Sequence, residues 1–405
     1  EIRAGGVTYK AKPPAYARDA RQGVDAELVH VPAVYAAKIG TLFDKNQDEQ
    51  ASAASRIRGK IVISEGFSFP GKILEFEQKG AVGVIAINPG ADSHWGICTS
   101  IWGTPDLDDL PRKPNIPVAA VNKADGDALI SLAGRRGRAT LVTQMEQGWY
   151  KQKVPVVTIP GAREKDKYVL LHGHYDSWDV GVGDNATGDA TLLELARVLW
   201  KNRKDLVRSV RIAWWPGHST GRYAGSTWFA DAFAIDLDEN CVAQVNCDSP
   251  GCRWATSYHQ TTTMPETAGH VKDVIGDIVG LKTFATKRPN QAGDYAFNNI
   301  GLSSYFMLSS TMPDDLRWEK HYYDVSGCGA NIAWHTENDT LEIADKANLL
   351  TDIRIYLLSV LRNANARVLP YDWRATVKEF RATIDAYQKA AGDRADLKPS
   401  AAAAR

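Results

Sequence analysis

Short apolar runs and stretches with apolar residues at helical spacing alternate along most of the chain. The apolar runs, which are typical of buried strands, cover residues 59–64, 81–87, 116–121, 168–171, 208–215, 242–246 and 302–308. The helical stretches cover residues 72–79, 124–133, 190–200, 225–233, 267–281, 346–363 and 374–391. Strands that alternate with helices indicate a mostly parallel, mixed sheet with helices on both faces. The pattern therefore predicts an α/β fold.

The same pattern divides the chain into parts. We expect an N-terminal segment at 1–50, a compact unit at 51–148, a catalytic domain at 149–365 and a C-terminal helical segment at 366–405. The first segment is expected to pack on the catalytic domain, and the tail from Pro399 to be disordered. The unit at 51–148 contains one candidate ligand, His94, and no acid–base cluster. We therefore interpret it as a binding or gating insert.

Composition excludes some partners. The 405 residues contain 48 acidic and 48 basic side chains, so charge gives no argument for a nucleic acid or an anionic membrane. No apolar stretch approaches the ~20 residues that span a bilayer. A chain that begins at Glu1 is expected to be a processed product or a trimmed piece. Five cysteines are too few for a disulfide scaffold; Cys247 and Cys252 are close enough for a local bridge, but buried thiols explain them equally well.

A polar cluster follows the apolar run at 168–171. His174, Asp176 and Asp184 lie just beyond the end of this expected strand, and in open α/β sheets that edge collects ligands and catalytic groups. An imidazole and two carboxylates are ligands for zinc or a similar divalent ion. Asp176 is also a candidate for orienting His174 or tuning a base, although a turn-forming aspartate would have the same place.

Four polar residues recur at the ends of expected strands or in loops: His174, Asp184, Asp248 and His335. Each alone has a simpler explanation, as a helix cap, a turn former or a hydrogen-bonding histidine. Together, on one side of one sheet, they favour a metal site.

The motifs around these residues resemble those of zinc peptidases of the glutamate carboxypeptidase II and transferrin receptor type, which are related to bacterial double-zinc aminopeptidases. The matching segments are His174-Tyr-Asp-Ser-Trp178, Asp184, Asn246-Cys-Asp-Ser249, His335-Thr336 with Asp339-Thr340, Asp294 with Phe297, and Ala364 to Asp372. The resemblance implies that His174, Asp184, Asp248 and His335 bind one or two zinc ions, and that the C-terminal helices support dimers.

Residues 51–148 resemble a protease-associated domain. The matching segments are Gly59-Lys-Ile-Val62, Phe67 to Lys72, Gly80 to Ile85 and Ile116-Pro-Val118. The resemblance implies an insertion that lies beside the catalytic domain.

One motif departs from the family. Where the family has a Glu-Glu pair, a base followed by a metal ligand, this chain has His218 and Ser219. A neutral serine is a poor substitute for a carboxylate. His218 can then be a nitrogen ligand, or it can deprotonate a water beside a single ion; a third reading is a fold that has lost catalysis. Because the other four ligands are all present, we favour a metal-dependent enzyme with altered chemistry.

Other residues are candidates for binding a substrate: Arg222, Tyr223, Asp294 and Trp334. Arg222 can hold a carboxylate or be a surface arginine, and Trp334 replaces a tyrosine that supports the oxyanion in the family's carboxypeptidases. The loop at 317–323 and Glu337 are weaker candidates, for which solvated positions are expected.

We therefore expect a metal-dependent hydrolase of an amide or peptide-like bond in a small substrate, with zinc, or another divalent metal, as cofactor. The alternatives are a lyase or another hydrolase on the same fold, and a non-catalytic binding protein. A homodimer and a secreted or periplasmic location are expectations from the family.

Overall fold

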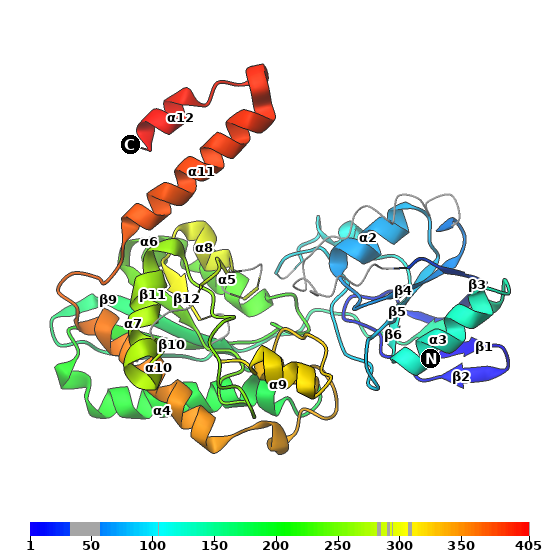
Figure 1. Ribbon diagram of the computed structural model, residues 1–405, viewed down its shortest axis with the longest axis horizontal. Helices are drawn as coiled ribbons and strands as arrows, with labels where there is room; N and C mark the ends of the chain where they lie inside the picture. The colour runs from blue at the N-terminus through cyan, green and yellow to red at the C-terminus, as the bar shows by residue number, and fades with distance from the viewer. Residues whose placement is uncertain are drawn as a thin grey trace.

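Two sheet-centred domains make up most of the chain, as the computed structural model in Figure 1 shows. The structure describes residues 1–32, 57–103, 105–281, 285–289, 292–293, 295–306 and 310–404. Of the helices within these ranges, none has the length and apolar character needed to cross a membrane.

The first domain contains a seven-stranded sheet in the order β2-β1-β7-β3-β4-β5-β6. Its strands are β1 (Ile2–Ala4), β2 (Val7–Tyr9), β3 (Ala20–His30), β4 (Ile61–Glu65), β5 (Gly83–Ile87), β6 (Val118–Val121) and β7 (Arg138–Thr143). Strands β3 to β6 run parallel. Helix α2 (Pro70–Gln78) connects β4 to β5, and α3 (Lys123–Ala133) connects β6 to β7. The side chain of Asn122 caps α3 by accepting from the N–H of Asp125.

The N-terminal segment is not a separate unit that only packs on the catalytic domain. Strand β1 pairs with β7, and β3 lies between β7 and β4, so this segment is part of the first domain's own sheet. The physical reason is burial: Ile2, Ala4 and Leu28 are buried in the same core as Ile61 and Leu141. Residues 33–56 of the expected segment lie outside the described residues.

The second domain contains a five-stranded sheet in the order β12-β11-β9-β10-β8. Its strands are β8 (Val156–Ile159), β9 (Glu164–His174), β10 (Arg208–Trp215), β11 (Cys241–Asn246) and β12 (Ser304–Tyr305). Strands β9 to β12 are parallel, and only the edge strand β8 is antiparallel among the described pairs. The predicted α/β fold with a mostly parallel sheet is confirmed.

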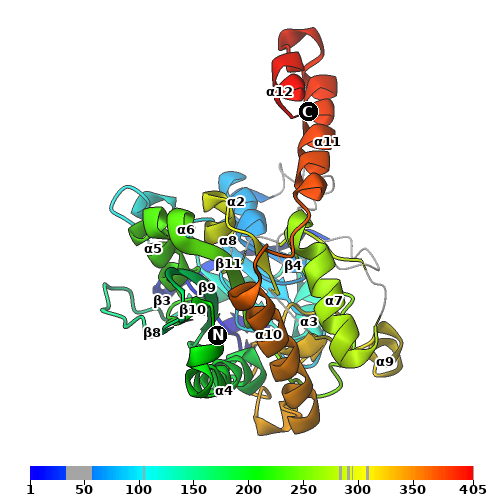
Figure 2. The same ribbon diagram turned by 90° about the vertical axis from the view of Figure 1, so that its left-hand side faces the viewer.

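Helices cover both faces of this sheet (Figures 1 and 2). They are α4 (Thr187–Lys201), α5 (Ala224–Ala232), α6 (Ala234–Asn240), α7 (Ala268–Val279), α8 (Tyr295–Ile300) and α10 (Lys346–Asn365). The short helix α9 (Asp314–Glu319) has no buried residue and belongs to neither core. Alternate residues of β9 point to opposite faces. Val169 and Leu171 therefore pack in the core with α4, α7 and α10, whereas Tyr168 and Leu170 pack with α5, α6 and α8.

The C-terminal segment is a pair of helices, α11 (Trp373–Ala391) and α12 (Lys398–Ala403), that projects from the second domain (Figure 2). The tail is helical rather than disordered in its described part. A run of alanines has the highest helix propensity, and the guanidinium of Arg381 donates from Nε to the carbonyl of Ala404 at 2.6 Å. Low sequence complexity alone was therefore a poor indicator here.

Candidate metal centre

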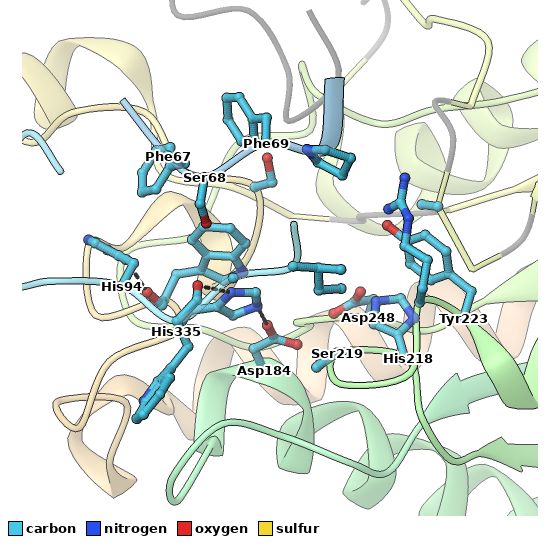
Figure 3. A pocket seen from close by; sticks show the side chains of 18 of the residues that line it. Phe67, Ser68, Phe69, His94, Asp184, His218, Ser219, Tyr223, Asp248 and His335 are labelled. Atoms are coloured by element: carbon cyan, nitrogen blue, oxygen red, sulfur yellow. Dashed lines mark hydrogen bonds and ion pairs between the residues drawn. The ribbon is translucent and has the colours of Figure 1, made fainter. Parts of the chain in front are cut away.

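The four predicted ligands meet at the carboxyl edge of the second sheet. Figure 3 shows three of them, Asp184, Asp248 and His335. His174 is the last residue of β9, and Asp248 follows the end of β11 by two residues. Asp184 lies in the turn η3 (Val182–Ala186) between β9 and α4, and His335 lies in a loop ahead of α10. Parallel strands bring their carboxyl ends to one edge, which explains why distant segments converge there.

Asp184 lies between the two imidazoles. Its Oδ1 is 2.9 Å from His174 Nε2, and its Oδ2 is 3.0 Å from His335 Nε2. Asp248 approaches from the other side, with Oδ2 3.6 Å from His174 Nε2. Asp184 therefore presents one carboxylate oxygen to each of the two histidines.

The hydrogen-bonding state of these atoms fits a bound cation. His174 Nδ1–H donates to the backbone carbonyl of Asp176 at 2.8 Å, which leaves Nε2 with a lone pair toward the centre. Both His174 Nε2 and Asp184 Oδ1 are buried, and neither has a hydrogen bond to any residue that the structure describes. Buried polar atoms without hydrogen bonds are rare, and a divalent ion is a partner that satisfies both.

The charges of the centre also favour a cation. Burial alone would raise the pKa of Asp184, but the adjacent imidazoles of His174 and His335 hold it well below its usual range. Burial alone would lower the pKa of His174, but Asp248 and Asp184 raise it well above its usual range. The carboxylates of Asp184 and Asp248 therefore stabilise a positive charge beside His174.

Asp176 supports the altered turn rather than His174. Its carboxylate oxygens accept from the backbone N–H groups of His218 and Ser219, both at 2.9 Å. The predicted orienting role toward His174 belongs to its backbone carbonyl, because its Oδ1 is 3.9 Å from His174 Nδ1. The side chain thus fixes where His218 and Ser219 lie.

His218 and Ser219 both lie against the centre. The ring of His218 stacks on that of His174, with centroids 3.9 Å apart and planes 6° from parallel. Burial and the nearby charge of His174 hold the pKa of His218 well below its usual range. Ser219 Oγ is buried and makes no hydrogen bond to a described residue. The turn from Pro216 to Ser226 contains no acidic residue, so no carboxylate reaches the centre from it.

A cavity of about 100 Å³ opens onto the centre between the two domains. Its walls include Phe67, Phe69, Pro70, His94, Ile97, Asp184, His218, Ser219, Arg222, Tyr223, Asp248, Trp334 and His335. Figure 3 shows Phe67, Phe69 and His94 on the side of the first domain and His218 and Tyr223 on the opposite side. An apolar cavity of about 150 Å³ holds a benzene ring, so this cavity accepts a small group.

Three of the predicted substrate residues line this cavity. Arg222 is buried, so it is not a surface arginine; its guanidinium lies 4.8 Å from the ring centroid of Trp102 and 5.1 Å from that of Tyr223. Trp334 stacks on His335 with ring centroids 3.6 Å apart. Asp294 lies outside the described residues.

The weaker candidates have other partners. Lys12 of the first domain donates to Glu337 at 2.6 Å, and the Glu337 side chain is exposed, as expected. Arg317 pairs with Asp314 at 3.2 Å, and Lys320 lies over the ring of Trp254 at 3.8 Å. The loop at 317–323 is not part of the cavity wall.

Sequence reasoning missed residues that hold the ligands in place. Asn185 donates to the carbonyls of His174 and Cys247 at 3.1 and 3.0 Å. Asp339 accepts from the N–H groups of Gly183 and Asp184 at 2.6 and 3.0 Å. Their positions within the Gly-Asp-Asn and His-Thr-x-x-Asp-Thr motifs were the available signal, although the motif gave no role for either.

The five cysteines are buried free thiols. Cys247 and Cys252 therefore do not form the local bridge that their spacing allowed.

Comparison with known proteins agrees with this geometry. Residues 155–358 match Peptidase family M28, and residues 24–129 match the PA domain. The chain belongs to peptidase family M28. The match runs from β8 into α10 and so includes all four candidate ligands.

Individual relatives are distant. The chain is 25% identical to a probable glutamate carboxypeptidase of Zea mays over 69% of this chain and 42% of that protein. It is 26% identical to carboxypeptidase Q of Rattus norvegicus over 44% of this chain and 39% of that protein. The chain thus spans less than half the length of these relatives. A zinc aminopeptidase from Bacillus subtilis has the same fold, with a TM-score of 0.64 at 18% identity, covering 92% of this chain and 83% of that one.

Proposed function

We propose that this chain is a metal-dependent hydrolase that cleaves an amide or peptide-like bond in a small substrate. The observation that carries the proposal is the buried pair of His174 Nε2 and Asp184 Oδ1, 2.9 Å apart and without hydrogen bonds to described residues. Imidazole nitrogens and carboxylate oxygens fit zinc. When bound, such an ion acidifies a water and polarises a carbonyl.

The ligand set favours one ion over two. His174, Asp184, Asp248 and His335 bring two carboxylates, whose charge balances one divalent cation. A second ion would need further anionic ligands, and the turn with His218 and Ser219 has none. We therefore expect one ion per chain, because the turn with His218 and Ser219 provides no carboxylate for a second ion.

We assign His218 to proton transfer rather than to metal binding. Nitrogen atoms of His174 and His218 and an oxygen of Asp248 lie within 4.8 Å of one another, which by distance alone allows a shared ion. However, the lone pair of an imidazole nitrogen lies in the plane of its ring, and these two rings are stacked nearly parallel. One ion cannot lie in both planes. A neutral His218 can instead accept a proton at the ring nitrogen nearest the centre.

The volume and the walls of the cavity indicate which kind of substrate it accepts. Its small volume favours a group the size of a single side chain, and its aromatic wall at Phe67 and Phe69 favours an apolar one. On the opposite side, the guanidinium of Arg222 has the geometry to bind a carboxylate through two parallel hydrogen bonds. We therefore propose a substrate with a small apolar group and a nearby carboxylate.

The altered turn also favours a second candidate, an enzyme that acts on another bond. A centre that lacks the Glu-Glu pair has lost its carboxylate base, and His218 is a weaker base in a buried site. Dipeptides and amino-acid arylamides separate the two candidates. Turnover of these substrates supports an amide hydrolase; an ion-loaded protein that cleaves none of them supports the second candidate.

His218→Ala tests the assigned role, with the exposed His321→Ala as control. We expect elemental analysis to find the ion in wild type and in both variants, and kcat of His218→Ala to fall by about 10²–10⁴-fold. Loss of the ion in His218→Ala would make this residue a ligand. Activity within a few-fold of wild type would remove it from the chemistry, and a wild-type protein that binds no divalent ion would favour a binding protein.

A further inference from the structure

Three hydrogen bonds link His94 and Trp95 of the first domain to Trp334 and His335. The N–H of Trp95 donates to the carbonyl of His335 at 2.9 Å, and His335 Nδ1–H donates back to the carbonyl of Trp95 at 3.1 Å. His94 Nδ1–H donates to the carbonyl of Trp334 at 2.6 Å. Because a carbonyl only accepts, the contact with Trp95 puts a proton on Nδ1 of His335 and directs Nε2 toward Asp184.

We propose that the first domain completes the metal centre, with His94 and Trp95 as positioning residues that fix the imidazole of His335 for its cation. The proposal rests on the proposed function, because it assumes that the cation is bound. It assigns to the first domain a role beyond forming one wall of the cavity.

The backbone at His335 needs such support. Its φ of 57° lies in the left-handed region, which a residue other than glycine adopts only when the surrounding structure holds it there. The carbonyl groups on both sides of this residue accept hydrogen bonds from the first domain. The contact therefore stabilises the conformation that points His335 at the centre.

The residues that make the contact are themselves fixed. The N–H of His94 donates to Asn88 Oδ1 at 2.7 Å, and the hydroxyl of Tyr323 donates to His94 Nε2 at 2.6 Å. Burial lowers the pKa of His94 to about 3, so its ring is neutral and has one donor and one acceptor. Each of its nitrogens has a partner, so His94 is a support and not a metal ligand.

Trp95 is held from the second domain as well. Its ring stacks on that of Trp178, with centroids 5.5 Å apart and planes 6° from parallel. Its indole N–H donates to Asp179 Oδ2 at 2.8 Å. Trp178 and Asp179 belong to the loop between His174 and Asp184. The backbone of Trp95 thus lies between the loops of two candidate ligands, and its carbonyl has little freedom to move away from His335.

Metal affinity measures this role directly. Removing a partner that orients a metal-binding histidine commonly lowers the affinity for the metal by about 10–100-fold. In His94→Leu the carbonyl of Trp334 loses its donor, whereas in His94→Asn the amide N–H can replace the imidazole N–H. Titration of the metal-free full chain with Zn²⁺ in competition with a chelator should give a Kd raised about 10–100-fold for His94→Leu. His94→Asn should stay within about 3-fold, less than the smallest loss expected for removing such a partner.

Thr143→Val is the matched control, because the hydroxyl of Thr143 is buried in the first domain and donates to the carbonyl of Arg18 at 2.6 Å. It should lower stability without changing the Kd. An equal loss of affinity in Thr143→Val would make the effect of His94 one of general stability. An unchanged Kd in a folded His94→Leu would overturn the proposal.

A second measurement keeps the proposal independent of the proposed function. The second measurement is NMR of metal-free protein with ¹⁵N-labelled histidine. In wild type the Nδ1 proton of His335 should be protected from exchange with water, and in His94→Leu this protection should be lost. If wild type binds no Zn²⁺, the proposed function fails, and this proton alone decides whether the first domain fixes His335. A proton that stays protected in His94→Leu contradicts the positioning role.

Discussion

Asn185 ties together three segments behind the candidate ligands. Besides its bonds to His174 and Cys247, its carbonyl accepts from the N–H of Ser249 at 2.9 Å. Because the side chain is buried, Asn185→Leu leaves three backbone groups without a partner, at about 1–3 kcal/mol each. We expect urea denaturation to show a free energy of unfolding lower by at least about 3 kcal/mol.

The matched control is Asn202→Leu at the exposed end of α4. Asn202 donates to the carbonyl of Val198 at 2.8 Å, but water can replace it there. We expect a change below about 1 kcal/mol, within the range of surface substitutions that lose one solvated hydrogen bond. A loss for Asn185→Leu as small as that for Asn202→Leu would show that the three segments hold together without this amide.

Asp176→Asn separates support of the turn from proton transfer. Both carboxylate oxygens of Asp176 accept backbone N–H groups, so the side chain has no free oxygen facing the turn. Asparagine keeps one acceptor and places its amide N–H₂ against the other donor. We expect kcat to fall, because His218 is displaced, but by less than in His218→Ala, and the ion content to stay at the wild-type level. A larger loss than in His218→Ala would mean that Asp176 itself transfers the proton.

Residue types and motif spacing were sufficient to predict that the four candidate ligands converge, but not which residues hold them in place. His174 and Asp248 follow recognisable strands, so their convergence could be expected from the order of elements. Asp339 and His94 act through backbone groups of segments far away in sequence. Such contacts depend on the exact path of two loops, which apolar patterning does not determine.

At the scale of elements, the central strands were predictable because they are buried on both faces. Strands β4, β5, β9 and β10 are long apolar runs in at least their central part. Strand β3 is mostly half-exposed and contains charged residues, and β1 is three residues long. Neither strand therefore has the apolar run by which a buried strand is predicted from sequence. The described strand β12 contains two residues of the seven expected at 302–308.

The packing of α7 on α10 gives a pH-dependent contribution to stability. His270 on α7 is buried, accepts from Asn363 Nδ2 at 3.1 Å, and contacts the rings of Tyr305 and Tyr371. Burial, with the charge of Arg362, lowers its pKa to about 4. The unfolded chain, with a pKa of about 6.5, then binds more protons between these values, so the free energy of unfolding falls as pH decreases from about 6.5 to about 4.

His270→Gln removes this proton and isolates its share of the pH dependence. A shift of this size corresponds to about 3 kcal/mol at most. We expect wild type to lose that much more stability than His270→Gln between pH 7 and pH 4, measured by urea denaturation at each pH. The exposed His321→Gln should follow the wild-type curve. Parallel curves for wild type and His270→Gln would place the acid sensitivity in other groups.

At the scale of the whole molecule, the candidate site belongs to both domains. The cavity has walls from each, and Lys12 and Asp92 of the first domain contact Glu337 and Asn338 of the loop that follows His335. The sequence predicted a protease-associated domain, and the match of residues 24–129 to the PA domain confirms that one is present. It did not predict that the insert touches a ligand loop, because no pattern within one domain encodes a contact with the other.

The projecting helix α11 leads to the last prediction, which concerns assembly. Trp373, Val377, Phe380, Ile384 and Tyr387 follow one another at spacings of four, three, four and three residues, as in the seam of a coiled coil. Trp373 and Phe380 are each 53% exposed, and Tyr387 is 65% exposed. Unless another surface covers it, such a stripe leaves apolar side chains exposed to water, which is unfavourable. We predict that a second copy of the chain does so, through antiparallel or parallel pairing of α11.

Light scattering after size exclusion should then give twice the chain mass of 44.4 kDa for wild type at micromolar concentration. The double variant Trp373→Glu/Phe380→Glu places charge in the seam and should give the mass of a single chain. Ile235→Glu is the matched control, because Ile235 on α6 is 76% exposed and lies outside the stripe. It should keep the wild-type mass, since its substitution adds charge without touching the seam. A wild-type protein with the mass of one chain, or a double variant with the mass of two, would mean that this face of α11 is not where copies meet.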